Sequence, residues 1–325
     1  MSETSRTTSL SARVLNGEVQ AIARLLTRVE NDDDVGNAAL ENLLPSSGNA
    51  HLIGVTGPPG GGKSTLVNEV IRNYRAAGKK VAVLAIDPSS PLTGGATLGD
   101  RIRMTEWHDD PNVFVRSMAS RQFGGGLAQN TLAAATVFDA AGFDPIIIET
   151  VGTGQDEVAI AQLAHTTLLI QVPGMGDSIQ TLKAGALEIG DVVVVTKSDR
   201  PESNELARDL RRMQTLTFGE PEEPTGWQAP VIKTSAITRE GIEQLVEAIS
   251  NHRLWLEQSG ELEVRLRRIA ATQLAARIQH DLMDQIRRPT EHGLFATMVD
   301  EILAKAITPQ RASQLLLALL AHERG

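Results

Sequence analysis

Cysteine is absent from the 325 residues of the chain. Its absence excludes disulfide bonds and thiolate metal ligands, and it suits a reducing compartment such as the cytoplasm. Apolar residues make up 41% of the chain, which is enough for one large core or for a core domain with helical additions.

Positive charge and long apolar runs are also scarce. The net charge is −9 and no long basic run occurs, so the overall field opposes binding to nucleic acid and to anionic membranes. The longest apolar runs, such as Val192–Val195, are far too short to cross a bilayer. The first residues lack an apolar signal core, and their Ser, Thr and Arg content would also suit a mitochondrial presequence. We expect instead a short frayed N-terminus, a cytoplasmic protein, and neither nucleic acid nor membrane as a partner.

The spacing of apolar residues divides the chain into three regions. Residues 1–48 are predicted to be a helical segment, with a helical pattern interrupted at ENDDDVGN and resumed as a short second helix at AALENLL. Residues 256–325 are predicted to be helical, with turns at RRPTEHG and ITPQ. Because this tail is apolar along its helices, we expect it either to fold back on the rest of the chain or to pair with a second copy.

Residues 49–255 between them alternate short apolar runs with amphipathic segments. Strands that are apolar on both faces and separated by helices are typical of a parallel sheet covered on both sides. The fold class is therefore predicted to be α/β, with a doubly wound, mainly parallel sheet. The predicted strands are HLIGVTG, KKVAVLAID, NVFVRSM, DPIIIETVG, TTLLIQVP, DVVVVTKSD and APVIKTSA.

A phosphate-binding loop follows the first of these strands. Gly57-x-x-x-x-Gly62-Lys63-Ser64 is a complete P-loop pattern between an apolar run and a helix start. Its backbone N–H groups and the helix N-terminus would surround the phosphates. Lys63 would bridge the β- and γ-phosphates, Ser64 would bind Mg²⁺, and Thr65 could reach the α-phosphate. The predicted phosphate-binding residues are Gly57, Pro58, Pro59, Gly60, Gly61, Gly62, Lys63, Ser64 and Thr65.

Three carboxylates could balance the charge of the triphosphate and its metal. Asp87 and Glu149 end predicted strands, and Asp100 follows the glycine-containing segment PSSPLTGGAT. Mg²⁺ binds few protein carboxylates directly, so one or two of the three are expected as ligands and another would hold or polarise water. Just beyond Glu149, Gly152 could approach the γ-phosphate. Gln155 would either orient the attacking water or begin a helix.

Guanine is favoured as the base. Asp199, after the strand VVVV, could accept hydrogen bonds from N1–H and the N2 amine of guanine together, a pair that adenine cannot offer. The stem of Lys197 would lie along the base, and the segment TSA, with Ser235 and Ala236, could give a backbone N–H to O6. These residues predict GTP and GDP as ligands rather than ATP.

Taken together, these motifs resemble the MeaB/ArgK family. The resemblance covers residue 10 to the C-terminus, and it rests on the P-loop and on DPSSP, LGDRIRM, ETVGTGQ, PGMGDSIQTLKAG, TKSD and TSA. It implies a SIMIBI-class P-loop GTPase with N-terminal helices, a central GTPase domain and a C-terminal helical dimerisation arm. It also implies a GTP-hydrolysing chaperone of adenosylcobalamin-dependent acyl-CoA mutases, which gates cofactor loading and protects the mutase from inactivation. We expect its turnover to be slow without the client, because a partner that supplies or orders a catalytic group can raise such rates by orders of magnitude.

The resemblance assigns roles residue by residue. Asp87, Asp100 and Glu149 are implied to have Mg²⁺ and catalytic roles, beside Lys63. Residues 173–183 are implied to be the mobile switch III that signals to the mutase, with Asp177 and Lys183 as its charged positions.

Two segments depart from the family pattern. The base motif begins with Thr196, where Asn is usual. An Asn side chain can join the base loop to the P-loop and can also contact guanine N7. Because the Thr side chain is shorter, we expect somewhat weaker nucleotide binding. Residues 117–129 differ from the methylmalonyl-CoA branch. The client could therefore be methylmalonyl-CoA mutase or a relative such as 2-hydroxyisobutyryl- or isobutyryl-CoA mutase.

Three other functions remain open. A metal-insertion GTPase would need soft or imidazole ligands, but the chain has no cysteine and its seven histidines are dispersed, so each is expected to be a surface or capping residue. A small-molecule kinase linked to amino-acid transport would need an acceptor pocket, for which no residues stand out. A scaffold that binds GTP only for stability would not need the carboxylate set.

Overall fold

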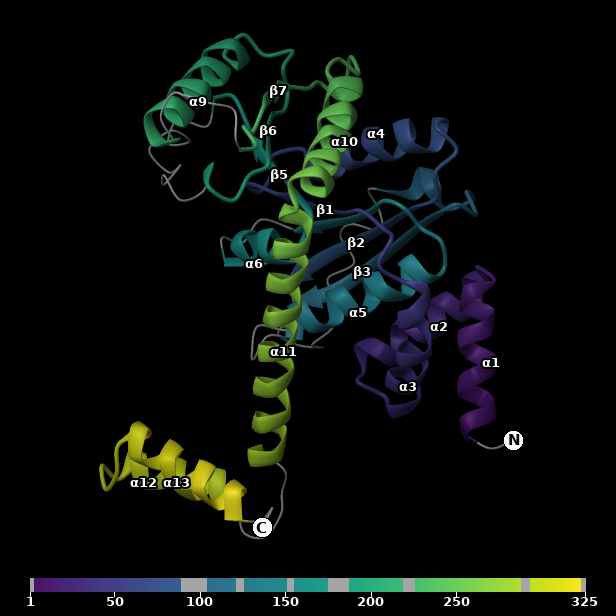
Figure 1. The fold of residues 1–325 in the computed structure, drawn as a ribbon. Coiled ribbons are helices and arrows are strands. Elements are labelled where there is room, and N and C mark those ends of the chain that lie inside the picture. Colours follow the sequence, from purple (N-terminus) through teal and green to yellow (C-terminus); the bar gives the residue numbers. More distant parts are fainter. Residues whose placement is uncertain are drawn as a thin grey trace.

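The computed structural model describes residues 3–88, 104–120, 126–150, 155–174, 187–218, 226–287 and 293–322. Its centre is a parallel seven-stranded sheet with the order β3-β2-β4-β1-β5-β6-β7 (Figure 1). Every predicted strand is confirmed, and so is the α/β class. The strands are β1 (Leu52–Thr56), β2 (Val81–Pro88), β3 (Val113–Ser120), β4 (Ile146–Thr150), β5 (Thr166–Gln171), β6 (Val192–Val195) and β7 (Val231–Lys233).

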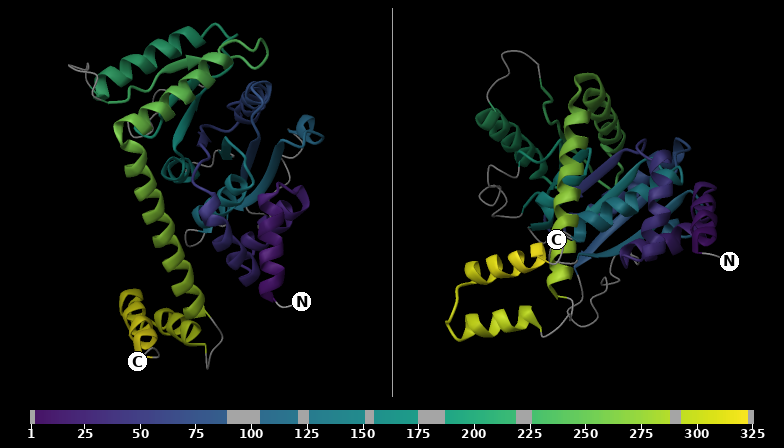
Figure 2. Two further views of the ribbon diagram at one scale, coloured as in Figure 1. Left: turned by 45° about the vertical axis from the view of Figure 1, so that its right-hand side comes forward. Right: turned by 60° about the horizontal axis from the view of Figure 1, so that its bottom comes forward.

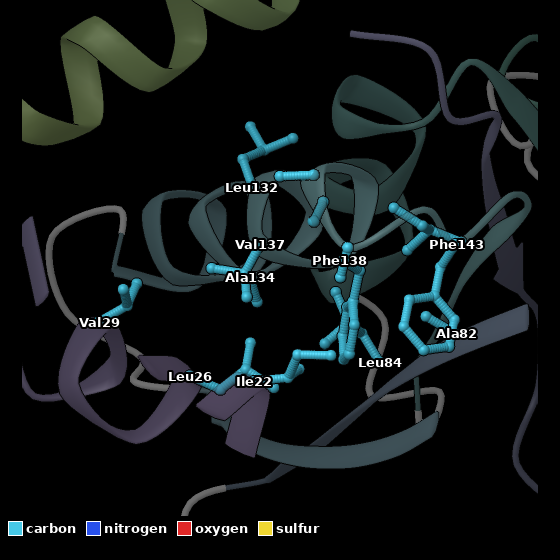
Figure 3. Close-up of a cluster of buried hydrophobic side chains, with 14 of the residues drawn as sticks. Ile22, Leu26, Val29, Ala82, Leu84, Leu132, Ala134, Val137, Phe138 and Phe143 are labelled. Atoms are coloured by element: carbon cyan, nitrogen blue, oxygen red, sulfur yellow. The ribbon is translucent and has the colours of Figure 1, made fainter. Parts of the chain in front are cut away.

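Helices cover both faces of the sheet because alternate strand residues point to opposite sides. In β4, Ile146 and Ile148 pack on one side with Phe138 of α5 (Gly126–Ala140), whereas Ile147 packs on the other side with the residues of α4 (Lys63–Ala76) and α10 (Ile242–Ser259). Figure 3 shows part of the first of these cores, in which α5 packs against both the sheet and α2 (Val19–Glu30). The remaining helices of this region are α6 (Gln155–Leu163) and α9 (Ser203–Phe218), with a short 3-10 helix η2 (Thr105–Trp107).

The N-terminal segment contains three helices where the sequence predicted two. They are α1 (Glu3–Leu15), α2 (Val19–Glu30) and α3 (Asp34–Leu43), followed by the 3-10 helix η1 (Leu44–Ser46). Gly17 ends α1, because its φ of 73° is a left-handed conformation that favours glycine. The predicted interruption at ENDDDVGN is shorter than expected, since the Asp33 side chain accepts a hydrogen bond from Gly36 N at 3.0 Å and α3 starts at once.

The C-terminal region is helical, as predicted. The long helix α11 (Glu261–Arg287) packs against α5, α6 and α10, and α12 (Leu294–Leu303) and α13 (Pro309–His322) lie side by side at its far end (Figures 1 and 2). We call these three helices the arm. Ile269 and Ala276 bury its inner face, but many apolar side chains stay exposed: Val264, Leu266, Leu274, Ile278, Leu294, Phe295, Val299, Leu303 and Leu317. In the described ranges, no helix combines the length and the apolar content that crossing a membrane requires.

Candidate nucleotide site

The glycine loop lies at the carboxyl end of β1. Strand β1 is flanked by β4 and β5, so the loop opens at the point where the order of the strands reverses, which is the usual ligand position in such sheets. Gly57 has a φ of 142°, and a Cβ there would lie 2.6 Å from the carbonyl oxygen of Ile170. Only glycine therefore allows the loop to pass this close to β5.

Lys63 is the first residue of α4 and folds back over the loop. Its Nζ donates hydrogen bonds to Gly57 O at 2.8 Å and to Pro58 O at 3.0 Å. The positive end of the α4 dipole faces the same loop. Cationic charge and the N-terminus of a 14-residue helix thus converge where the sequence predicted the phosphates.

Ser64 and Glu149 meet at the base of this loop. Ser64 Oγ donates a hydrogen bond of 2.6 Å to Glu149 Oε1, and both residues are buried. Glu149 reaches this position because it pairs in register with Val55 of β1. A hydroxyl and a carboxylate oxygen are the ligands that Mg²⁺ prefers, so this donor set fits a magnesium ion.

The other predicted metal and switch residues are described only in part. The backbone of Asp87 lies near the end of β2, two positions beyond Ala85, which pairs in register with Glu149. Gln155 is the first residue of α6. The side chains of Asp87 and Gln155 are outside the described part of the structure. Asp100, Gly152, Asp177 and Lys183 lie outside the described residues altogether.

Two hydrogen bonds tie the base loop to the glycine loop. Thr196 Oγ1 donates to Gly61 O at 2.7 Å, and Lys197 Nζ donates to Gly60 O at 2.9 Å. Lys197 has a φ of 54°, which turns its side chain back toward the P-loop. The expectation of weaker nucleotide binding rested partly on the shortness of Thr196, but the hydroxyl does reach the P-loop.

Asp199 is exposed, and Ser235 holds its side chain. The hydroxyl of the buried Ser235 donates a hydrogen bond of 2.8 Å to Asp199 Oδ1, which leaves the other oxygen available to a ligand. Ser235 itself is fixed through its backbone N–H, which donates to Glu240 O at 3.0 Å. Sequence reasoning assigned Ser235 to the nucleotide but missed this orienting contact, although Ser at this position of the TSA segment was the available signal.

A second polar group lies at the opposite, amino end of the sheet. We call it the amino-end cluster, and it consists of His51, Thr166, Asp191, His252 and Arg265. Thr166 Oγ1 lies 2.7 Å from His51 Nε2 and 2.8 Å from His252 Nδ1. Arg265 of α11 donates through NH1 to Asp191 Oδ2 at 2.8 Å and also contacts the other oxygen through NH2. The cluster thereby joins the starts of β1, β5 and β6 to α10 and to the arm.

Burial controls the protonation of these histidines. It lowers the pKa of His252 to about 4, against the weaker opposing charge of Asp191, and it lowers the pKa of neighbouring His165 to about 4. The pKa of His51 is also well below its usual value, chiefly through burial. The prediction that every histidine is a surface or capping residue was therefore wrong for His51 and His252, because residues distant in sequence converge at the start of parallel strands.

Comparisons with known proteins agree with this geometry. A family model described as the methylmalonyl-CoA mutase-associated GTPase MeaB matches residues 22–291. A putative GTPase of Pyrococcus abyssi is 41% identical over 308 residues, which are 95% of this chain and 95% of that protein. The mitochondrial methylmalonic aciduria type A homolog of Mus musculus is 33% identical over 270 residues, 82% of this chain and 64% of that protein. The crystal structure of a LAO/AO transport system kinase covers 98% of both chains with a TM-score of 0.70 at 23% identity, which shows a shared fold.

Proposed function

The chain belongs to the MeaB family of methylmalonyl-CoA mutase-associated GTPases, and from this premise we propose that it hydrolyses GTP to control an adenosylcobalamin-dependent acyl-CoA mutase. In this proposal GTP hydrolysis gates the loading of the cobalamin cofactor and protects the mutase from inactivation. The observation that supports it most is the joined arrangement of the P-loop and the base loop, with Asp199 exposed at the far end. A site of this form suits a purine nucleotide whose phosphates lie on the glycines.

The roles of the residues follow from their positions. Lys63 would give up its two carbonyl contacts to hold the β- and γ-phosphates, because an ammonium group binds phosphate oxygens more strongly than neutral carbonyls. Ser64 would be a Mg²⁺ ligand, with Glu149 behind it to orient the hydroxyl or a metal-bound water. Magnesium would supply neutralisation of the charge that develops on the phosphates. Asp87, Asp100, Gly152 and Gln155 are proposed to complete this end of the site, and hydrolysis is proposed to be slow without the client.

Nucleotide binding is tested with Lys63→Ala. Isothermal calorimetry with a non-hydrolysable GTP analogue and Mg²⁺ should show a loss of at least about 100-fold in affinity, since charge-assisted hydrogen bonds to the β- and γ-phosphates are removed. Lys79→Ala is the matched control, because Lys79 lies beyond the C-terminal end of α4, where its Nζ is 3.6 Å from Asp144 Oδ2. Tight GTP binding by Lys63→Ala would refute the assignment of the P-loop.

The client is proposed to be methylmalonyl-CoA mutase or a relative such as 2-hydroxyisobutyryl- or isobutyryl-CoA mutase. Pull-down with each mutase, in GDP and in a non-hydrolysable GTP analogue, would identify it. Asp177 and Lys183 are proposed to transmit the signal, so their substitution should leave basal GTPase activity nearly unchanged and remove its stimulation by the mutase. If basal and stimulated rates fell together, this role would be wrong.

The arm is proposed to form a homodimer. Exposed apolar side chains on α11, α12 and α13 support this, since a face of that kind is normally covered by another chain. Light scattering at micromolar concentration should give a dimer, and Val299→Glu with Leu303→Glu should give a monomer that still binds GDP. A wild-type monomer would reject the proposal. The lack of cysteine supports a cytoplasmic location for the complex.

A further inference from the structure

We propose that this site recognises guanine without a hydrogen bond to N7, and that Thr196 serves to join the base loop to the P-loop instead. The inference rests on the proposed binding of GTP. It concerns a point on which the chain departs from the usual base motif, where Asn stands in place of Thr196. The ligand class that follows is 6-oxo-2-aminopurine nucleotides, whatever atom occupies position 7.

The first observation is the hydrogen-bonding state of Thr196. Its side chain is buried, with 5% of the residue exposed, and Oγ1 lies 2.7 Å from Gly61 O in donor geometry. A second carbonyl, Gln171 O, lies 3.3 Å from the same oxygen. Two carbonyl oxygens therefore compete for the one proton that a hydroxyl can donate.

The second observation is a count of the other donors that begin the base loop. Lys197 Nζ donates to Gly60 O, and the backbone N–H of Ser198 donates to Thr234 O at 3.0 Å. The backbone N–H of Thr196 itself donates to Gln171 O at 2.9 Å. Both backbone N–H groups are therefore committed to the protein, and Lys197 Nζ uses one of its three N–H groups on Gly60 O. The Ser198 hydroxyl has no hydrogen-bond partner among the described residues, but it is buried within the protein.

N7 of guanine is an acceptor, so it needs a donor. An asparagine amide has two N–H groups and could give one to Gly61 O and the other to the base. Threonine has a single O–H, and moving it to N7 would leave Gly61 O without the donor that now holds it. We therefore expect the Thr196 hydroxyl to keep its hydrogen bond to the buried Gly61 O, at 2.7 Å, when the nucleotide binds.

Guanine would then be distinguished from adenine at the opposite edge of the purine, which carries N1, the N2 amine and O6. Asp199, held by Ser235, would accept from N1–H and the N2 amine, and the backbone N–H of Ala236 would serve O6. An analogue that changes only position 7 leaves these contacts intact, whereas one that changes position 1 or 2 removes them.

The decisive measurement compares GDP with 7-deaza-GDP, in which N7 is replaced by carbon. Calorimetry on the wild-type protein should give dissociation constants within about twofold of each other, because no hydrogen bond is lost. Thr196→Asn should restore a preference for GDP of about fivefold, the usual net value of one hydrogen bond. A wild-type loss of fivefold or more with 7-deaza-GDP would overturn the inference, as would a Thr196→Asn protein with no preference.

Two further variants test the joining role of Thr196. Thr196→Val should weaken GDP and 7-deaza-GDP equally, by about tenfold, because Gly61 O loses its donor. Thr196→Ser keeps the hydroxyl and should restore both affinities. Unequal losses in Thr196→Val would contradict the proposal, since they would mean that the hydroxyl contacts N7.

ADP and IDP separate this inference from the proposed function. If the wild type binds GDP no better than ADP, the GTPase assignment itself fails. If it prefers GDP over ADP and IDP but loses affinity for 7-deaza-GDP, the guanine site stands and only the inference about Thr196 is wrong.

Discussion

The two ends of the central sheet use polar residues in opposite ways. At the carboxyl end, Asp199 is exposed and Lys63 donates to the carbonyl oxygens of Gly57 and Pro58, so both side chains can exchange these contacts for those of a ligand. At the amino end, Asp191 is buried between Arg265 and the backbone N–H of Thr167, and its partners are all part of the protein. The first arrangement suits binding, and the second stabilises the fold.

The difference shows that polar clustering alone does not identify a functional site. Both ends contain acidic and basic groups at hydrogen-bonding distance, and each has a helix that starts after a glycine at positive φ: α4 after Gly62 at the carboxyl end and α11 after Gly260 at the amino end. Availability of the groups, rather than their number, distinguishes the two ends.

The largest expected effect is on stability at the amino end. Asp191→Ala should lower the free energy of unfolding by about 3 kcal/mol, because the partly buried Arg265 loses its carboxylate partner and the backbone N–H of Thr167 loses its acceptor. Urea denaturation measures this, and Asp199→Ala is the matched control at the carboxyl end, for which a change below about 0.5 kcal/mol is expected. Equal losses in the two variants would remove the distinction between the ends.

A second effect, of no greater size, is expected from pH. The pKa of His252 is about 4 in the folded protein, below its ordinary value of 6.5, so between these pH values the unfolded chain binds more protons than the folded one. Stability should therefore be complete above about pH 6.5 and fall as the pH drops to about 4, with a loss on the order of 3 kcal/mol from His252.

Denaturation in urea at several pH values checks this loss. His252→Asn should show a shallower fall between pH 6.5 and 4.5 than the wild type. An identical pH profile in the two proteins would mean that His252 is not the source.

At the carboxyl end, Asp199→Asn should weaken GDP by about 10- to 30-fold and reduce the preference for GDP over ADP. The neutral amide accepts one hydrogen bond where the carboxylate would accept two charge-assisted ones. Calorimetry with both nucleotides measures the change, and an unaltered preference would count against Asp199 as the base-selecting residue.

The smallest effect is expected from Ser235→Ala. Loss of the 2.8 Å hydrogen bond frees the Asp199 side chain, so that GDP should bind about fivefold more weakly while the melting temperature changes little. The double variant with Asp199→Asn should lose little more than Asp199→Asn alone, because Ser235 acts through Asp199. Additive losses would show that Ser235 contacts the nucleotide independently.

Much of the fold and part of the site could be predicted from local patterns. Continuous apolar runs such as VVVV and IIIE predict buried strands by themselves. The P-loop and TKSD motifs are recognised from the spacing of residues within a few positions of each other. These signals depend on residues close together in sequence, which is why all seven strands and the helical tail were correct.

Contacts between distant residues could not be predicted in this way. The distance from Thr196 Oγ1 to Gly61 O depends on the order of β1, β5 and β6 in the sheet, and the meeting of His51 with His252 depends on how α10 packs. Neither the strand order nor the packing of α10 can be predicted from the spacing of residues along the chain. The break at Gly17 was missed because a single left-handed glycine hardly disturbs a helical pattern of apolar residues.

Strand β6 has only four residues, and the residues directly before and after it are held by hydrogen bonds to other parts of the protein. Asp191 before it is held by the arm through Arg265, and Thr196 after it is held by the glycine loop. Deleting one valine would turn the remaining side chains to the opposite face of the sheet, and it would break either the Asp191–Arg265 contact or the Thr196–Gly61 contact. The length of β6 is therefore fixed from both sides, and changes in chain length in this half of the molecule can be accommodated only outside the strand.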